Sequence, residues 1–437
     1  MENNFCANCR EKLPDGAEFY PNCSPKAEKS IKSDPNIVKP KKKKTLLAII
    51  IAAVMIISAG AVYPGAEEAY ADDINADEMN NIGLEYQYGE GVEQDYAKAL
   101  EWYEKAADAG STDAMNNIGV LYEYGEGVEQ DYAKALEWYE KAADSGNTDA
   151  MFNIGCLYAN GLGVEQDYAK AFEWLKKAAD AGDTDAMNNI GLLYSNGDGV
   201  EQDYAKALEW FEKAADAGNV DAMKNIVGCY YNGLGVEQDY AKAFEWLEKA
   251  ADAGDTTAMN NIGFLYCNGA GVEQDYAKAL EWYEKAADAG DTTAMTNIGY
   301  MYIYGEGVEQ NYEKAMEWFK KAAESGDASG MREIGTMYYL GNGVEQDYAK
   351  ALEWYEKAVD AGDATAMYNI GLMYDFGEGV EQDYAKALEW YEKAADAGNA
   401  QAMNSIGLMY EYGIAVPQSS TTANEWYAKA EAAGYTG

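Results

Sequence analysis

Histidine is absent from this 437-residue chain, and positively charged residues are scarce. The 33 Lys and Arg residues face 76 Asp and Glu residues, so the formal net charge is −43. The lack of histidine removes the commonest general base and the commonest metal ligand from consideration. The lack of positive charge excludes nucleic-acid binding over most of the chain, because that binding depends on Lys and Arg displacing counterions from phosphates.

Cysteine is scarce as well, with six residues in the whole chain. Cys156, Cys229 and Cys267 lie singly and without regular spacing, so no disulfide framework is expected. A thiol-dependent enzyme is one alternative function, but a cysteine nucleophile needs a nearby base or cation that lowers its pKa. Because the chain is acidic and lacks histidine, we interpret these three cysteines as small buried side chains and predict that the protein is not an enzyme.

The other three cysteines lie in residues 1–26, where Cys6 and Cys9 form a Cys-x-x-Cys pair and Cys23 follows. This segment resembles the short zinc ribbon that opens many bacterial membrane proteins, in which four thiolates hold the metal. The resemblance implies Zn bound by Cys6, Cys9 and Cys23. The fourth cysteine of that pattern is replaced by Tyr20. Two interpretations stay open: zinc completed by an outside ligand, or a degenerate ribbon that binds no metal.

Residues 27–44 form a basic linker that ends in four lysines, and residues 45–63 are uncharged and mostly aliphatic. Nineteen such residues are long enough for a helix to cross a bilayer. Basic residues precede this segment and acidic residues follow it in the linker 64–75. The positive-inside rule then predicts a single-pass protein of the cell membrane, with its N-terminus in the cytoplasm and the rest outside. A cleaved signal peptide is the alternative.

Residues 76–437 repeat every 36 residues. Methionine recurs ten times at this spacing without insertion, from Met79 to Met403, and all ten tryptophans keep the same step, from Trp102 to Trp426. A fixed period of this length is typical of a solenoid, in which no unit can bury its apolar face without its neighbours. We number the repeats one to ten, and we number a position by its distance after the methionine of its repeat.

Each repeat has the pattern of two helices. In repeat one, Met79, Ile82 and Tyr86 share one helical face with Gly83, which lets the partner helix approach closely. The second helix has its own apolar face: Tyr96, Ala99, Leu100, Tyr103 and Ala107.

The helix ends are marked too. A Gly-x-Gly pair that begins at Gly89 ends the first helix, Asp95 precedes the second and Gly110 ends it. The first helix of every later repeat is preceded by a residue type that favours the N-cap: Ser111, Asn147, Asp183, Asn219, Asp255, Asp291, Asp327, Asp363 and Asn399.

The repeating motif Ala-Met-Asn-Asn-Ile-Gly-x-Leu-Tyr-x-x-Gly-x-Gly-Val-x-x-Asp-Tyr-x-Lys-Ala-x-Glu-Trp-Tyr-x-Lys-Ala-Ala resembles the Sel-one-like repeat, a relative of the tetratricopeptide repeat. The resemblance implies an all-α, right-handed solenoid of ten 36-residue helix-turn-helix repeats. It also implies a scaffold or adaptor that binds protein partners on a concave side lined by the first helices. The family motif is specific for the fold and does not identify a partner.

A comparison of the ten repeats separates packing positions from variable ones. Positions three and seven never change, whereas positions one, five, eight and nine vary. The variable residues are polar in early repeats, for example Asn80 and Asn116, and become aromatic or basic in repeats seven to nine. Such side chains dominate binding hot spots, so we predict the partner site there, with neutral drift between repeats as the alternative. The predicted site is Tyr300, Ile303, Tyr304, Arg332, Tyr339, Leu340, Tyr368, Leu372 and Phe376.

The leading functional hypothesis is therefore a membrane-anchored scaffold that binds a protein partner through its repeats. A second alternative is calcium binding by recurring carboxylates. Calcium needs six to eight oxygens that converge on one point, and carboxylates on the surfaces of repeating helices do not obviously do so. The candidate residues in repeat one are Glu93, Glu101, Glu104 and Asp108.

Four residues depart from the repeat pattern and lead to three local predictions. Glu85 stands in repeat one where repeat two has Leu121, so this position should pack on a preceding repeat. Ser420 and Asn424 make repeat ten a polar cap. Val227 replaces the contact glycine in repeat five, and a branched side chain there should distort the helix pair.

Overall fold

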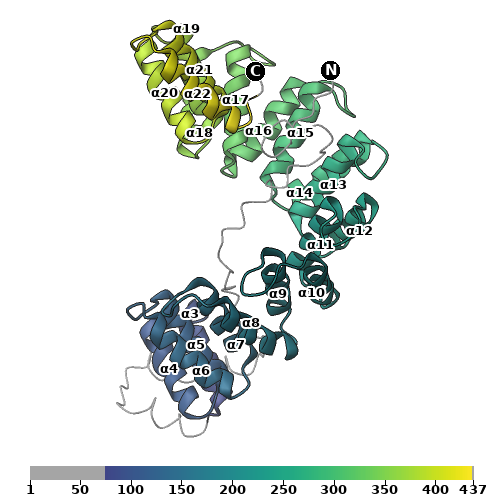
Figure 1. Ribbon diagram of the computed structural model, residues 1–437, viewed down its shortest axis with the longest axis vertical. Coiled ribbons are helices and arrows are strands. Elements are labelled where there is room, and N and C mark those ends of the chain that lie inside the picture. Colours follow the sequence, from purple (N-terminus) through teal and green to yellow (C-terminus); the bar gives the residue numbers. More distant parts are fainter. Residues whose placement is uncertain (1–73, 436–437) are drawn as a thin grey trace, which may run out of the picture. The chain divides into compact units, whose positions relative to one another are not determined.

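The computed structural model describes residues 74–435, and Figure 1 shows them as helices joined by short loops. This range contains twenty α-helices of 13 residues each and no strand, two helices to a repeat. The predicted all-α solenoid of ten repeats is confirmed. The helices are α3 (Ala76–Tyr88), α4 (Tyr96–Asp108), α5 (Thr112–Tyr124), α6 (Tyr132–Asp144), α7 (Thr148–Asn160), α8 (Tyr168–Asp180), α9 (Thr184–Asn196), α10 (Tyr204–Asp216), α11 (Val220–Asn232), α12 (Tyr240–Asp252), α13 (Thr256–Asn268), α14 (Tyr276–Asp288), α15 (Thr292–Tyr304), α16 (Tyr312–Glu324), α17 (Ala328–Leu340), α18 (Tyr348–Asp360), α19 (Ala364–Phe376), α20 (Tyr384–Asp396), α21 (Ala400–Tyr412) and α22 (Ser420–Ala432).

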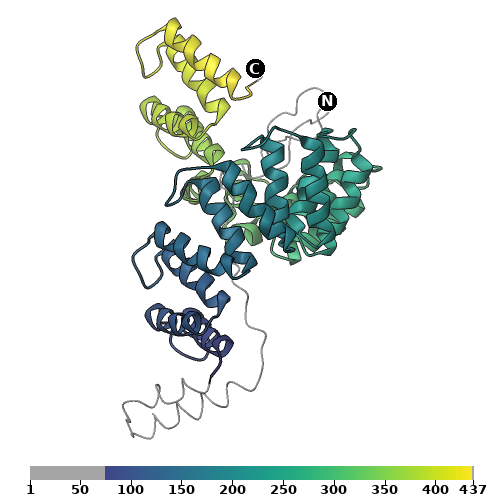
Figure 2. The same cartoon turned by 60° about the horizontal axis from the view of Figure 1, so that its bottom comes forward.

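The chain divides into two compact units within α11. Of the described residues, one unit contains 74–229 and 234–236, and the other contains 230–233 and 237–435. Both units are built from repeats of the same kind, each a pair of helices. Figure 2 shows this pair most clearly at the yellow C-terminal end, where α21 and α22 lie side by side.

The helices begin and end where the sequence predicts. Asp95 has extended backbone angles, and its carboxylate accepts a hydrogen bond from the Lys98 amide at 3.1 Å, which caps α4. Gly89 ends α3 in the left-handed conformation, with φ of 69°, and donates its amide hydrogen to the Glu85 carbonyl. The same two caps recur from repeat to repeat, so local sequence alone sets the helix length.

The second glycine of each Gly-x-Gly pair serves contact between repeats. Gly127 follows α5 with φ of 73°, and a β-carbon added there would lie 2.5 Å from the β-carbon of Tyr96. Tyr96 begins α4 in the preceding repeat. The loop of one repeat therefore packs against the second helix of the repeat before it, and any larger residue would push the two apart. The interpretation of Gly-x-Gly as a turn is confirmed.

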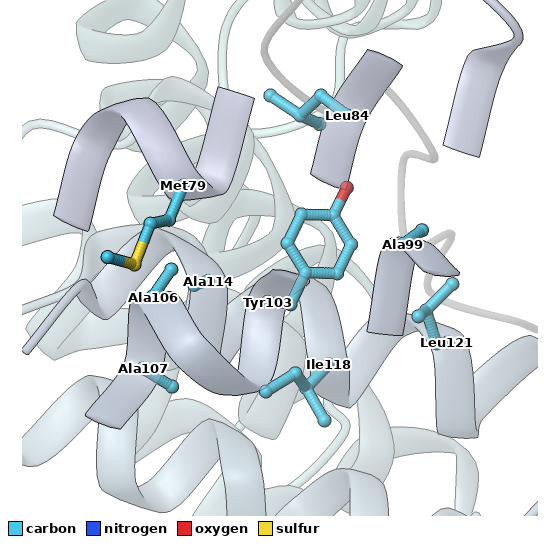
Figure 3. Close-up of a cluster of buried hydrophobic side chains, with 9 residues drawn as sticks. All are labelled: Met79, Leu84, Ala99, Tyr103, Ala106, Ala107, Ala114, Ile118 and Leu121. Carbon is cyan, nitrogen blue, oxygen red and sulfur yellow. The ribbon is translucent and has the colours of Figure 1, made fainter. Parts of the chain in front are cut away.

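Within a repeat, the two helices touch at the glycine of position four. A β-carbon on Gly119 would lie 2.5 Å from the ring of Tyr139, which is fully buried. Figure 3 shows the equivalent ring of repeat one, Tyr103, between Leu84 and Ile118 with its hydroxyl at the Leu84 end. Glycine is needed in these two repeats because a ring from the second helix occupies the space of its side chain.

The register prediction for position six is confirmed. Leu121 of α5 is fully buried in the same cluster as Ala99 and Tyr103 of α4, so it packs on the preceding repeat. Glu85 is only partly buried, and burial, together with the charge of Glu90, raises its pKa. A carboxylate is tolerated at this position in repeat one because the side chain keeps access to water.

The C-terminal cap is confirmed by the exposure of α22. This helix buries only two residues, both alanines, and it leaves Ser420 and Asn424 exposed. In this helix, exposed polar residues replace the apolar ones of the other second helices.

Repeat five departs from the others at Val227. A β-carbon on the next residue, Gly228, would meet no atom within 4 Å, so Gly228 does not replace the missing contact glycine. The division between the two units also falls in this helix, α11. Whether Val227 distorts the helix pair stays a prediction.

The predicted membrane protein requires a correction. None of the helices in residues 74–435 is long and apolar enough to cross a bilayer, since each spans 13 residues. The single-pass location in the cell membrane, with the N-terminus in the cytoplasm, is therefore wrong for the part of the chain that the structure describes. The segment 45–63, on which the prediction depended, lies outside that part, as do residues 27–44 and 64–73.

The metal predictions fall in two places. The zinc-ribbon segment with Cys6, Cys9, Cys23 and Tyr20 lies outside the described residues, so zinc binding there stays a prediction. Between residues 74 and 435, no three Asp, Glu, Cys or His side chains come together in a way that could hold a metal ion. The calcium hypothesis therefore gains no support from the carboxylates of the array.

Candidate protein-interaction surface

Position one, predicted to be part of a free face, is a packing position. Asn80 and Asn116 are both 7% exposed. Asn117 donates a hydrogen bond to the side-chain oxygen of Asn80 at 3.0 Å, and Asn153 does the same to Asn116. Equivalent bonds join Asn225 to Asn188 and Asn297 to Asn260. A ladder of buried amides thus ties neighbouring first helices together, because a buried amide needs a partner.

Arg332 stands at position one of repeat eight and is buried in an ion-pair cluster. Its guanidinium lies 2.6 Å from the Asp363 carboxylate, 3.0 Å from the Glu333 carboxylate and 3.4 Å from the Tyr300 hydroxyl. Burial alone would lower the pKa of Arg332, but the two carboxylates raise it overall. Arg332 therefore joins repeats seven, eight and nine, and with its side chain 8% exposed it offers almost no surface to a partner.

The residue type at position eight depends on the residue that faces it from the second helix. Where that residue is tyrosine, position eight is usually polar and accepts a hydrogen bond from the hydroxyl. Tyr139 donates to Glu123 at 2.6 Å and Tyr391 donates to Asp375 at 2.9 Å. Tyr103 with Gln87 and Tyr427 with Glu411 repeat the arrangement.

Where the facing residue has no hydroxyl, the side chain at position eight need not accept a hydrogen bond and can be apolar. Leu175 of repeat three is paired with Ala159, and Phe319 of repeat seven is paired with Ile303. Ile303 packs against the buried cluster that contains Phe319. The aliphatic side chain of Ile303 is thus explained by packing within its own repeat.

Tyr339 is the exception, because its own hydroxyl reaches into the next repeat. It donates a hydrogen bond to the Glu378 carboxylate, and its ring packs edge-on against Tyr348 at 5.3 Å. The facing Tyr355 uses Thr336 as its acceptor instead, at 3.3 Å. Tyr339 is therefore half-buried and held in place on both sides.

Three further residues of the predicted site are partly buried. Tyr300 packs edge-on against Phe319 at 5.5 Å, and Tyr368 lies 5.5 Å from the ring of Tyr391. Leu372 packs against the core cluster of repeats nine and ten. These side chains therefore pack against the core and leave only part of their surface exposed.

Position nine is the exposed one. Tyr304, Leu340, Phe376 and Tyr412 are 64%, 55%, 63% and 66% exposed, and we call these four residues the apolar column. Each is the last residue of a first helix and precedes a left-handed glycine. Tyr412 was not part of the predicted site, although the tyrosine at position nine of repeat ten is visible in the sequence.

The other repeats differ at position nine. Repeats three to six have asparagine there, and the amides of Asn160 and Asn268 fold back to a carbonyl of their own helix at 3.0 and 2.9 Å. Repeats one and two have Tyr88 and Tyr124, which are 42% and 44% exposed. The fold therefore accepts a polar residue at position nine, and packing does not demand the large apolar side chains of repeats seven to ten.

The helices of the apolar column have no accessible cation. Arg332 is the only Lys or Arg on α15, α17, α19 and α21, and it is buried. The lysines of these repeats lie on the second helices, mostly over aromatic rings; Lys314 is 5.0 Å from Tyr302 and Lys321 is 3.8 Å from Trp318. The ends of the first helices are therefore apolar and acidic.

The three cysteines of the array are not arranged for catalysis. Cys156 and Cys229 are buried and Cys267 is half-buried. Burial raises the pKa of Cys229 to about 11 and that of Cys267 to about 12, and it also raises the pKa of Cys156. Such thiols are protonated at neutral pH, so they are poor nucleophiles.

These features define an all-α repeat protein in which paired helices stack through conserved packing positions. The chain belongs to the Sel1 repeat family, whose model matches ten times: residues 79–111, 112–147, 148–183, 184–219, 227–255, 256–291, 292–327, 328–363, 364–399 and 400–435. The match to repeat five begins at Val227, the residue that replaces the contact glycine. Among curated protein sequences, none matches the chain.

Two solved structures are similar over much of their length. One is a protective antigen present in uropathogenic Escherichia coli strains, which displays an SLR fold; it is 35% identical, with a TM-score of 0.56 over 85% of this chain and 79% of that one. The other is a Sel1 repeat protein from Oxalobacter formigenes, 36% identical, with a TM-score of 0.51 over 57% of this chain and 100% of that one. The Sel1 repeat solenoid is a fold suited to protein–protein interaction.

Proposed function

We propose that this protein is an interaction scaffold and that it binds a protein partner through the apolar column of repeats seven to ten. One observation carries the proposal: four successive repeats expose a large apolar side chain at the same position. The fold does not require this, since repeats three to six have asparagine there. Exposed apolar patches on folded proteins mark interaction sites.

The surroundings of the column suit a binding hot spot. Tyr304 stacks on Tyr300 with ring centroids 6.3 Å apart, and the Tyr300 hydroxyl lies near Arg332. Tyr339, beside Leu340 in the chain, is held by Glu378 of the next repeat. Hot-spot side chains bind strongly when their neighbours hold them in place, because little side-chain entropy is then lost.

The residues of the predicted site take different parts in this proposal. Tyr304, Leu340, Phe376 and Tyr412 would contact the partner directly. Arg332 would act as a positioning residue, because it joins three repeats. The other members of the predicted site would hold the contacting side chains in place: Tyr300, Ile303, Tyr339, Tyr368 and Leu372.

The test compares partner capture by full-length variants after cross-linking in intact cells. Truncation of Phe376 or Tyr304 to Ala should weaken capture of a specific protein by about 1 to 3 kcal/mol, the usual range for a hot spot. The matched controls are Asn196→Ala and Asn268→Ala, which truncate the same position in repeats four and six. A partner captured equally well by the Phe376 and Tyr304 variants would rule out this site.

A further inference from the structure

We propose that the apolar column takes a cationic amphipathic segment, one that alternates apolar side chains with Lys or Arg. This deepens the proposed function and rests on it, because it names the chemistry of the partner at the same surface. The charges around the column point to this class of partner.

The first observation is that the first helices of the column present no accessible Lys or Arg. Each second helix carries a lysine over its own tryptophan, as Lys357 does at 3.9 Å from Trp354. Each of them except α22 carries another over a tyrosine of the first helix, as Lys350 does at 5.2 Å from Tyr338. Arg332, on a first helix, is neutralised by Glu333 and Asp363. On the first helices of repeats seven to ten, the only Lys or Arg is therefore buried and paired.

The second observation is a pair of carboxylates beside the column. Glu306 and Glu378 follow Tyr304 and Phe376 by two residues, with a left-handed glycine between. Neither has a Lys or Arg nitrogen within ion-pair distance in residues 74–435. They remain uncompensated negative charges.

Glu378 lies between repeats eight and nine. Glu378 accepts the hydrogen bond of Tyr339, the residue before Leu340, so repeat nine places its carboxylate beside the column residue of repeat eight. Glu378 therefore lies where repeats eight and nine meet, and Glu306 follows the column residue of repeat seven.

Carboxylates next to exposed apolar side chains select a partner by charge. A segment with Lys or Arg between apolar side chains would pair its cations with Glu306 and Glu378 while its apolar side chains cover the column. An acidic segment would face those carboxylates without compensation, and residues 292–435 as a whole carry 23 acidic and 9 basic residues. Like charges at an interface disfavour the wrong partner and slow its approach.

Three synthetic peptides of about 14 residues test the inference with the full-length chain, by fluorescence anisotropy in 0.15 M NaCl. The first alternates Leu or Phe with Lys, the second replaces Lys with Glu, and the third replaces the apolar residues with Ser and keeps Lys. We expect the first peptide to bind at least about tenfold more tightly than either of the others, since only it satisfies both features of the surface.

Matched variants locate the binding. Phe376→Ala should weaken binding of the first peptide about tenfold, and Glu378→Gln, which keeps an acceptor for Tyr339, should weaken it severalfold and reduce its dependence on salt. Asn196→Ala and Asp198→Asn change the same two positions in repeat four and should leave binding unchanged.

The outcomes separate this inference from the proposed function. Equal binding of the Lys and Glu peptides would overturn the charge selection, and so would weaker binding of the Lys peptide. Binding that Phe376→Ala leaves unchanged would show unspecific attraction to an acidic protein, which also overturns it. If none of the peptides binds while Phe376→Ala still loses a partner captured from cells, the inference fails and the scaffold function stands. If capture from cells is also unaffected, both fail.

Discussion

At the residue scale, the junction between repeats three and four places carboxylates together. Asp183 caps α9, and its pKa is raised to about 6, mainly by burial and further by the charges of Asp185 and Asp149. The amide of Ala186 donates a hydrogen bond to Asp183 and opposes this shift. At the junction between repeats four and five the cap is not a carboxylate. Asn219 caps the first helix of repeat five and donates a hydrogen bond to Asp185 at 2.7 Å.

Asp183→Asn should therefore stabilise the protein at pH 7. The pKa of Asp183 is higher in the folded chain than the value of about 4 in an unfolded chain. The folded state thus binds the extra proton, and the stability contributed by this group falls as the pH rises through about 4 to 6. The melting temperature of the variant should exceed that of the wild type at pH 7 and the gap should shrink at pH 4.5. Asp216→Asn, on an exposed position, is the control, and a gap that does not depend on pH would contradict the assignment.

Arg332 makes a second residue-scale prediction. Its removal leaves the carboxylates of Glu333 and Asp363 buried without their cation. Arg332→Ala should lower the free energy of unfolding by about 3 to 5 kcal/mol, the usual cost of breaking a buried ion pair from one side. Urea unfolding measures this. The double variant Arg332→Asn with Glu333→Asn restores the residues of repeat one at both positions and should recover part of the loss; no recovery would mean that charge is not the cause.

At the element scale, a glycine of the first helix and a ring of the second decide how closely each pair packs. Gly119→Ala should destabilise the protein by about 1 to 3 kcal/mol, because its β-carbon would meet the ring of Tyr139. Gly228→Ala is the matched control in α11, where the added carbon meets no atom within 4 Å. This control should be neutral or stabilising by up to about 1 kcal/mol, since alanine favours helix. Equal losses in both variants would count against the contact. Val227→Gly tests repeat five in the same measurement.

The pairing of position eight with the second helix is also an element-scale feature. Tyr139→Phe removes the hydroxyl that donates a hydrogen bond to the Glu123 side chain, which is 5% exposed, and should cost about 1 to 3 kcal/mol. Adding Glu123→Ser should recover most of this, because repeat four already combines Phe211 with Ser195. A double-mutant cycle measures the coupling, and additive losses would show that the two positions vary independently.

At the scale of the whole molecule, net charge opposes folding. The net charge is −43, and the Lys–Asp pairs at the starts of the second helices are exposed, so they contribute little. Raising NaCl from about 0.02 to about 0.3 M shortens the screening length from roughly 20 Å to about 6 Å. The melting temperature should therefore rise over this range, because repulsion among carboxylates is screened. A fall would mean that the exposed ion pairs outweigh the repulsion.

The sequence by itself determined the repeat architecture and its boundaries. Caps such as Asp95 and Gly89 act on their own few residues, and the 36-residue period shows directly which positions every repeat must keep. Position six could even be assigned to contact with the preceding repeat, from the contrast between Glu85 and Leu121. Local capping and periodic burial are short-range effects, so a single sequence with ten internal copies contains enough information to read them.

Only the tertiary structure decided which variable positions face solvent. Arg332 and Asn80 vary between repeats as Phe376 does, yet the first two are buried against the next repeat and the third is exposed. Ile303 varies because Phe319 faces it, not because a partner does. Variation records whether a residue changes, whereas exposure depends on the helices that surround it. That arrangement comes from contacts between residues more than 30 positions apart, such as Arg332 with Asp363, and those contacts exist only once the repeats have stacked.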